Sequence, residues 1–243
     1  HQYRIAIRRS RAIAEAVVDI SGDSDLRKAV KSLKRHGQAT SRLRDLHVLL
    51  GDLAQWPLEE DTRLALVSSG ARSHFANLAD NEHQELTKRL NSGQYRKDMD
   101  EWHQLLTSRH LKKVTRKLTA EDIHKTLEKH IHKHNAVARN LNEQSPDNHF
   151  HDLRKRLKRI RYLAELNKPA FHDRLRPLKH RQQRFGDFQD LHVQIDMLLA
   201  FRNSIATEPD MLAPVAGLNT LISDLAVEKH RVRADILSLG GID

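Results

Sequence analysis

HDLRKRLKRIRYLAEL, residues 151–166, is the segment on which the interpretation of this chain depends. Its first eleven residues carry six positive charges and one negative charge. Apolar residues recur at three- and four-residue spacing here and along most of the chain, a pattern that predicts helices. The exposed face of a helix usually mixes charges of both signs, so this excess of Arg and Lys needs a further explanation.

The same pattern occurs at the start of the chain. Residues 1–15 read HQYRIAIRRSRAIAE and align without gaps with residues 151–165, HDLRKRLKRIRYLAE. The matched polar pairs are His1 with His151, Arg4 with Arg154, Arg8 with Lys158, Arg9 with Arg159, Arg11 with Arg161, and Glu15 with Glu165. A match of this kind indicates an internal repeat.

Two further pairs of segments extend the repeat. They are LKRHGQ (33–38) with LKHRQQ (178–183), and LRDLHVLLGDL (43–53) with FQDLHVQIDML (188–198). The offset is 150 residues for the first motif and 145 for these two, so the first copy carries five extra residues near its first turn. Matched segments in one order, with a single length change in a loop, predict a duplicated helical unit.

Composition limits the classes of partner. The 243 residues carry a net charge of +10 with the 17 histidines neutral. A chain this basic is expected to bind an anion, and protonated histidines would add positive charge below about pH 6.5. There is no cysteine for disulfides or thiolate chemistry. Apolar runs are far shorter than the ~20 residues of a membrane-spanning helix, so we expect a cytoplasmic protein without a membrane partner.

We predict an all-α fold of two pseudo-symmetric four-helix bundles, one for each copy of the repeat. Residues 1–243 would form one domain, with a first repeat at 1–92, connecting helices at 93–146 and a second repeat at 147–243. Glycine and proline residues, which interrupt helices, place the helices at about 2–20, 24–37, 40–55 and 60–91, two within 94–145, and then 148–167, 172–185, 187–206 and 210–238.

The repeated basic residues share one face of each predicted helix, because positions i, i+3, i+7 and i+10 line up. Each stripe would be about 15 Å long. Like charges so close repel each other, so their presence in both copies predicts a compensating anion that is extended rather than compact. The two stripes are His1, Arg4, Arg8 and Arg11, and His151, Arg154, Lys158 and Arg161.

Other polar groups receive more modest roles. Asp45 and Asp190, matched in the repeat, are expected to orient an arginine of the first helix of each copy. His130 and His134 have the i, i+4 spacing of a zinc pair, but no third ligand is evident and we predict no metal site. Nucleotide-binding and nucleophile motifs are missing, which favours binding without catalysis, with no catalytic residue and no cofactor.

These residues resemble the CHAD family, the conserved histidine α-helical domain. Its hallmark is an H-x-x-R-x-x-x-[RK]-R-x-R helix present twice, matched by HQYRIAIRRSR and HDLRKRLKRIR. A downstream L-G-x-x-[RNQ]-D-x-x-V segment is matched by RLRDLHV and FGDFQDLHV. The resemblance extends over essentially the whole chain. Ser41 stands where the first copy often has glycine, whereas Gly186 keeps that glycine in the second copy.

The resemblance implies that the chain binds inorganic polyphosphate in a basic groove or cavity between the two repeats. It also implies targeting to polyphosphate granules. The family's basic residues carry over to both stripes, and to Lys34 and Lys179 on the second helix of each copy. Lys155 is a further candidate, although its counterpart in the first copy is Ile5.

Three alternatives remain open at this point. The first is nucleic-acid binding, because a basic helix can enter a major groove, although few aromatics are available for stacking on single strands. The second is a phosphohydrolase or kinase that acts on polyphosphate with a metal ion. The third is a metal-binding or phosphorelay protein that uses His1 and His151 chemically. Polyphosphate binding ranks first, and the sequence does not determine the oligomeric state.

Overall fold

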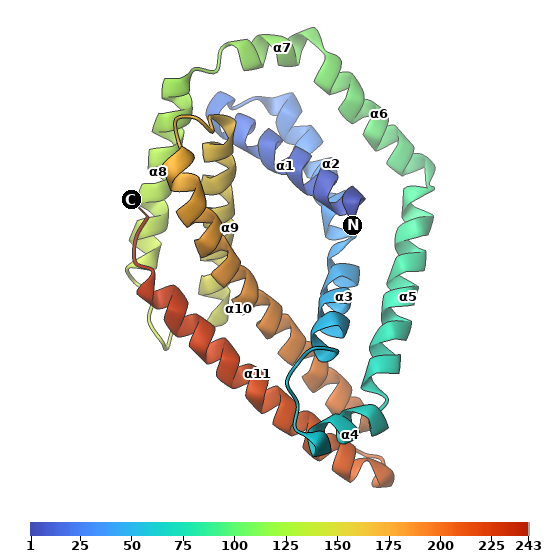
Figure 1. Ribbon diagram of the computed structural model, residues 1–243. Helices are drawn as coiled ribbons and strands as arrows, with labels where there is room; N and C mark the ends of the chain where they lie inside the picture. The colour runs from blue at the N-terminus through green and yellow to red at the C-terminus, as the bar shows by residue number, and fades with distance from the viewer. Residues whose placement is uncertain (243) are drawn as a thin grey trace. The chain divides into compact units, whose positions relative to one another are not determined.

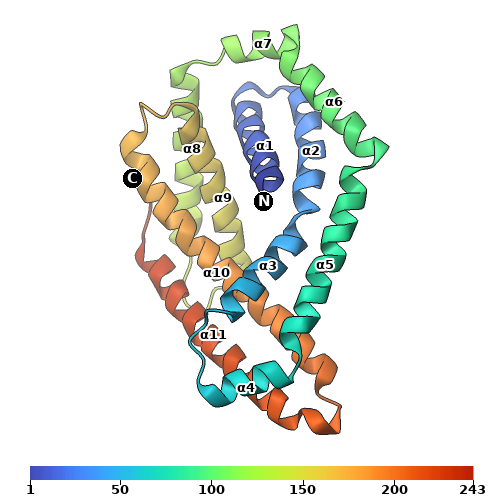
Figure 2. The ribbon, with the colours of Figure 1, turned by 45° about the vertical axis from the view of Figure 1, so that its right-hand side comes forward.

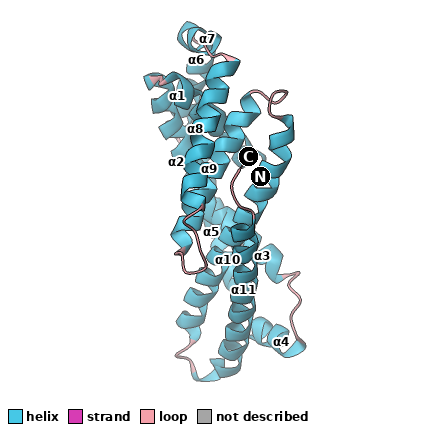
Figure 3. Cartoon of the chain, turned by 90° about the vertical axis from the view of Figure 1, so that its left-hand side faces the viewer, coloured by secondary structure: helices cyan, strands magenta, loops and turns pink. Residues whose placement is uncertain are grey.

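The computed structural model describes residues 1–242, and all the regular secondary structure in this range is helical (Figures 1 and 3). The all-α prediction is therefore confirmed. The α-helices are α1 (Gln2–Ser21), α2 (Ser24–Gln38), α3 (Ser41–Leu53), α4 (Glu60–Ser68), α5 (Ala71–Leu90), α6 (Gly93–Thr107), α7 (Arg109–Arg116), α8 (Ala120–Ala138), α9 (Asp147–Leu166), α10 (His172–Ile205) and α11 (Leu212–Ser238), with a short 3-10 helix at Pro209–Met211.

Several predicted boundaries were wrong. The helix expected at 60–91 is divided into α4 and α5, because Gly70 adopts a left-handed φ of 70° that ends the first of them. Conversely, the two helices expected at 172–185 and 187–206 form the single helix α10, which continues through Gly186. Residues 94–145 hold α6, α7 and α8 rather than two helices.

The chain divides into two compact units. Unit 1 comprises His1–Thr40, Lys88–Phe185 and Ile236–Asp243, and unit 2 comprises Ser41–Thr87 and Gly186–Asp235. Each unit therefore draws helices from both copies of the repeat, and the expected arrangement of one four-helix bundle per copy is not confirmed. The proposed domain boundaries in the sequence stay a prediction.

In unit 1, helix α1 packs against α2, α8 and α9, and α8 packs against α9 (Figure 2). Ala14 and Val17 of α1 form a buried apolar cluster with Leu26 of α2 and Leu111 of α7. A polar contact joins α2 to α6, because His36 Nε2 lies 2.9 Å from Asp98 Oδ2 and both side chains are buried. Helix α1, which carries the first basic stripe, is therefore held by packing on several sides.

Unit 2 has its own apolar core. Leu43, Leu46 and Leu49 of α3 are buried at three-residue spacing, as expected for the inner face of an amphipathic helix. The ring of Phe75 on α5 lies 5.6 Å from that of Phe201 on α10. The three leucines of α3 lie within the repeated segment 43–53, and Phe201 follows its counterpart, 188–198. Packing of these residues therefore also positions the matched aspartates, Asp45 and Asp190. Within residues 1–242, no helix is both long and apolar enough to cross a bilayer.

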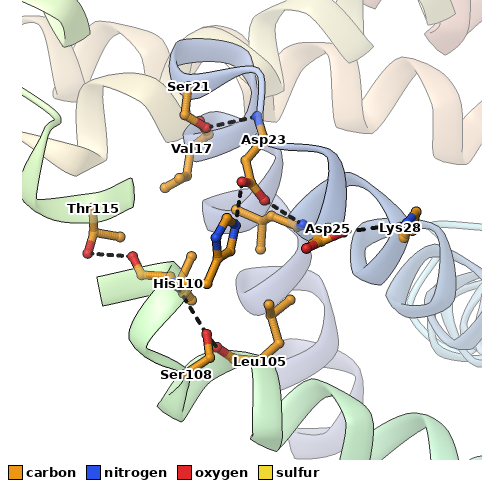
Figure 4. Close-up of polar contacts among 11 residues, drawn as sticks. Val17, Ser21, Asp23, Asp25, Lys28, Leu105, Ser108, His110 and Thr115 are labelled. Atoms are coloured by element: carbon orange, nitrogen blue, oxygen red, sulfur yellow. Dashed lines mark hydrogen bonds and ion pairs between the residues drawn. The ribbon is translucent and has the colours of Figure 1, made fainter. Parts of the chain in front are cut away.

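The turn between α1 and α2 depends on one carboxylate (Figure 4). Gly22 ends α1 with a left-handed φ of 72°, and Asp23 then caps α2 by accepting a hydrogen bond from Leu26 N at 2.8 Å. The second carboxylate oxygen lies 2.7 Å from His110 Nε2 on α7. The cap and the His110 contact hold the pKa of Asp23 below its usual value. Asp23 thus links the α1–α2 turn to α7.

We predict that Asp23→Ala lowers the free energy of unfolding by about 1–2 kcal/mol at neutral pH, because α2 loses its cap and His110 of α7 loses its contact with the carboxylate. Urea denaturation would measure the change. Asp25→Ala is the matched control, since Asp25 is exposed and pairs only with Lys28 at 3.5 Å on the same helix. Equal effects of the two substitutions would show that the Asp23 contacts add no stability.

A cluster of cations on the two motif helices

The two predicted basic stripes lie on neighbouring helices. Helix α1 carries the first motif and α9 the second, and these helices pack against each other within unit 1 (Figure 2). Segments 150 residues apart in the sequence are therefore brought side by side. The helical period places the motif cations of each helix on one face, and the apolar face of α9, with Leu153, Leu157 and Ile160 buried, faces the core.

Lys158 lies where the cations of the two stripes converge. Its side chain is half-buried, and burial together with nearby positive charges lowers the pKa of its ammonium group from 10.5 to about 7. Burial has the largest effect, and the charges come from both helices: Arg154, Arg8, Arg11 and Arg4. No carboxylate is among these main influences. The structure thus places an uncompensated lysine among four arginines.

Matched glutamates hold the last arginine of each stripe. Arg11 Nε lies 3.4 Å from Glu15 Oε1, and Arg161 Nε lies 3.5 Å from Glu165 Oε1. The Arg161 guanidinium also stacks over the ring of Tyr162, 4.6 Å from its centroid. Sequence reasoning aligned the two glutamates but gave them no role. Their i, i+4 spacing from an arginine in both copies was the signal that could have identified them.

The three arginines of the first stripe have different surroundings. Arg4 Nη1 donates a hydrogen bond to the carbonyl oxygen of Thr40, 3.1 Å away, just beyond the end of α2. Arg11 extends toward Gly37 of α2, where a Cβ added to the glycine would lie 3.6 Å from Arg11 Nη1. Arg8 is exposed. Arg4 and Arg11 are therefore oriented by contacts with α2 or with their own helix, whereas Arg8 is accessible to a ligand.

The other predicted site residues lie farther from this centre. His1 is exposed at the N-cap of α1 and makes no side-chain cap bond, whereas His151 is half-buried on α9. Lys34 on α2 and Lys179 on α10 are exposed, and neither is among the main charges that act on Lys158. Lys155 is also exposed and forms an ion pair with Asp152, 3.0 Å away. The structure thus groups five cations at the core of the site rather than the whole predicted set. They are Arg4, Arg8, Arg11, Arg154 and Lys158.

The prediction for Asp45 and Asp190 was wrong about their partner. Both contact Arg44 of α3, not an arginine of a first helix. Arg44 binds Asp190 through two hydrogen bonds of 2.5 Å, and its Nη1 lies 3.2 Å from Asp45 Oδ1. The hydrogen bond to Asp190 raises the pKa of Arg44, despite burial. Asp190 therefore joins the two copies of this motif within unit 2 through Arg44, whereas Asp45 contacts Arg44 within its own copy.

Two histidines of α8 depart from the expectation that protonated histidines add positive charge. Burial, and to a lesser extent nearby cations, lower the pKa of His130 and of His134 to about 4, with Arg159 acting on His130 and Arg181 on His134. Both imidazoles therefore stay neutral near pH 6.5. Arg159, which lies off the main stripe, pairs with Asp19 of α1 at 2.6 Å. In the part of the chain that the structure describes, no three His, Asp or Glu side chains are grouped to hold a metal ion.

Two cavities in unit 1 lie apart from the stripes. One, of about 460 Å³, is lined by His124, Phe171 and Arg174 among others, and the second, of about 220 Å³, by His134 and Arg181 among others. Neither is lined by a basic residue of the two stripes. The candidate site is therefore a cationic helix face rather than either of these cavities.

These features define an all-helical protein built around a duplicated basic helix whose two copies pack together. The family model of the CHAD domain matches residues 1–199, which include both motif helices and most of α10. The chain therefore belongs to the CHAD family, as the motifs suggested. The match ends before α11, so it does not extend over the whole chain. A comparison with curated protein sequences finds no matching relative.

Lys158 should lower the free energy of unfolding of the protein without a bound anion near neutral pH. Its pKa is lower in the folded chain than in the unfolded chain, so the unfolded chain binds more protons above about pH 7. The free energy of unfolding should therefore rise as pH increases from about 7 toward 10. We predict that Lys158→Met is more stable than the wild type at pH 7 by at least about 1 kcal/mol, with a difference that shrinks as pH rises.

Denaturation of both proteins across this pH range, with anions other than chloride left out, would test the effect. The exposed Lys168 offers a matched control, because Lys168→Met removes a lysine outside both stripes. A Lys158→Met protein that is less stable than the wild type at every pH would show that the ammonium is compensated in the folded chain.

Proposed function

We propose that this protein binds inorganic polyphosphate, without catalysis, on the face formed by the two motif helices. The observation that carries the proposal is the convergence of Arg4, Arg8, Arg11 and Arg154 on the half-buried Lys158. Packing so many like charges together costs free energy in the empty protein. An anion that lies among them would remove this cost and would be held by charge-assisted hydrogen bonds.

The shape of the cluster favours an extended anion. Each stripe runs along about 15 Å of helix, and the two stripes lie on adjacent helices. One orthophosphate would contact only one or two of these side chains, whereas a linear chain of phosphates presents a negative charge at every unit. Arginine is suited to this ligand, because its guanidinium binds two phosphate oxygens at once.

The chemistry of the face favours polyphosphate over nucleic acid. Single strands are held largely by bases stacked on aromatic side chains, and aromatic residues are only 5% of this chain. On α9 the ring of Tyr162 is buried beneath Arg161 rather than offered to a base. Family membership is compatible with a polyphosphate-related role, and we propose polyphosphate granules as the cellular location of such binding.

A competition titration tests the proposal. Labelled long-chain polyphosphate would be bound at physiological salt and displaced with unlabelled polyphosphate or with duplex DNA at equal concentrations of charge. We predict that polyphosphate competes at least about a hundredfold better than DNA, because only polyphosphate is narrow enough to bring every unit into contact with Arg and Lys side chains. The double variant Arg8→Ala, Arg154→Ala should bind at least about tenfold more weakly.

The matched control is Arg72→Ala, Arg176→Ala, which removes the same charge from exposed positions outside both motifs. This control should retain most of the wild-type affinity. If the two double variants bind alike, or if DNA competes as well as polyphosphate, the cluster is a general basic surface and the proposal fails. Release of orthophosphate from polyphosphate in the presence of magnesium would contradict the non-catalytic part of the proposal.

Binding should also depend strongly on salt. Each phosphate neutralised by Lys or Arg releases a condensed counterion, so the logarithm of the affinity should fall linearly with the logarithm of the salt concentration. With five cations in the core of the site, we expect a slope of about −3 to −5. Titrations between low and physiological sodium chloride would measure it. A slope near zero would show that the arginines do not contact the phosphates.

A further inference from the structure

The two stripes differ at one cationic position. Three of their four matched positions are identical, but Arg8 of the first copy corresponds to Lys158 of the second. These two side chains also differ in surroundings, because Arg8 is exposed and Lys158 is half-buried. The lysine therefore occupies the more enclosed of the two equivalent positions.

This difference matters because the two residue types respond differently to crowding by like charges. An arginine remains charged in proteins under all ordinary conditions. A lysine that is partly buried beside other cations can release its proton and so relieve the repulsion. The pKa of about 7 for Lys158 follows from burial first and then from its four arginine neighbours.

Within residues 1–242, the main charges that act on Lys158 include no acid from a neighbouring helix. Toward Lys158, the charged groups of α1 are Arg4, Arg8 and Arg11, and α9 itself adds Arg154. Three acidic side chains of α1 and α9 have other partners. Glu15 pairs with Arg11, Glu165 with Arg161, and Asp19 with Arg159.

Within residues 1–242, no charge of helix α8, which also packs on α9, is among the main ones that act on Lys158. Lys129 and Lys133 act on His130, which lies near Asp19 and Arg159. His130 is already neutral above about pH 5, because burial and these cations lower its pKa to about 4. Titration of His130 therefore does not account for a change at Lys158 between pH 7 and 9.

We propose that Lys158 is the adjustable cation of the site: at about pH 8 its amine is largely uncharged while the site is empty and takes up a proton when a polyanion binds. The proposal rests on the proposed function, because the bound phosphates supply the negative charge that retains this proton. Binding is then linked to pH above neutrality, in a range separate from that of ordinary histidines. Affinity falls as pH rises above about 7, because binding takes up a proton and the concentration of free protons is then lower.

Calorimetric titration of long-chain sodium polyphosphate into the intact chain would test the proposal. At about pH 8, titrations in two buffers that differ in enthalpy of ionisation give the number of protons taken up for each site filled. The wild type should take up close to one proton at Lys158, and its affinity should fall about five- to tenfold between pH 7.5 and pH 8.5.

Lys158→Arg is the decisive variant, because it keeps a cation at this position but cannot release the proton. It should bind polyphosphate with about one proton fewer taken up and with little change in affinity over the same pH range. Above about pH 8 it should bind more tightly than the wild type. Lys168→Arg is the matched control and should retain the wild-type proton uptake. Any other group that titrates in this range contributes equally to all three proteins.

The outcomes separate the two proposals. Polyphosphate binding with equal proton uptake by the wild type and Lys158→Arg would overturn the role of Lys158 and leave the proposed function standing. A wild type that fails to bind polyphosphate even at about pH 6.5, where Lys158 is charged, would overturn the proposed function itself. If Lys158→Arg does not fold, Lys158→Met provides the second test, and it should also lose the pH dependence while binding more weakly.

Discussion

The packing of α1 against α9 is the contact on which the candidate site depends. Each motif helix alone would present a row of cations to solvent, where water and salt screen their repulsion. Once the helices pack together, apolar residues such as Leu157 are buried and Lys158 becomes half-buried beside the arginines of both copies. The free energy of apolar burial therefore holds together a set of charges that would otherwise separate.

The protein compensates some of these charges and leaves others uncompensated. The outer arginines of the stripes pair with Glu15 and Glu165, and Arg159 pairs with Asp19. Lys158 has no such carboxylate among the main influences on its charge. Paired arginines are held in position, whereas an uncompensated lysine gains most from an incoming anion. The candidate site thus contains both oriented and uncompensated cations.

Both pairs of repeated motifs make contacts between the two copies. Helices α1 and α9 bring the first motif of each copy together in unit 1. The downstream motifs also meet, because Arg44 of the first copy binds Asp190 of the second within unit 2. Each compact unit is thus assembled from both halves of the chain. A repeat in sequence need not be a unit of packing, since an apolar helix face can be buried equally well against its own copy.

The sequence by itself determined the helical class, the duplication and the identity of the motif cations. Helical period and spacing are local properties, so the stripes on α1 and α9 could be recognised without tertiary contacts. The family motifs were also readable, because they consist of residue types at short fixed intervals. Local signals were less reliable for helix boundaries, because α10 continues through Gly186 and α4 ends at Ser68, just before Gly70.

Only the tertiary structure decided which cations share an environment. The sequence placed Lys158 in a stripe and gave Lys155 as a further candidate, but it did not show that Lys158 is half-buried among arginines while Lys155 pairs with Asp152 in solvent. The partner of Asp190 and the neutrality of His130 were equally hidden. Burial and the distances between charges on different helices set these properties, and both arise only when segments remote in sequence pack together.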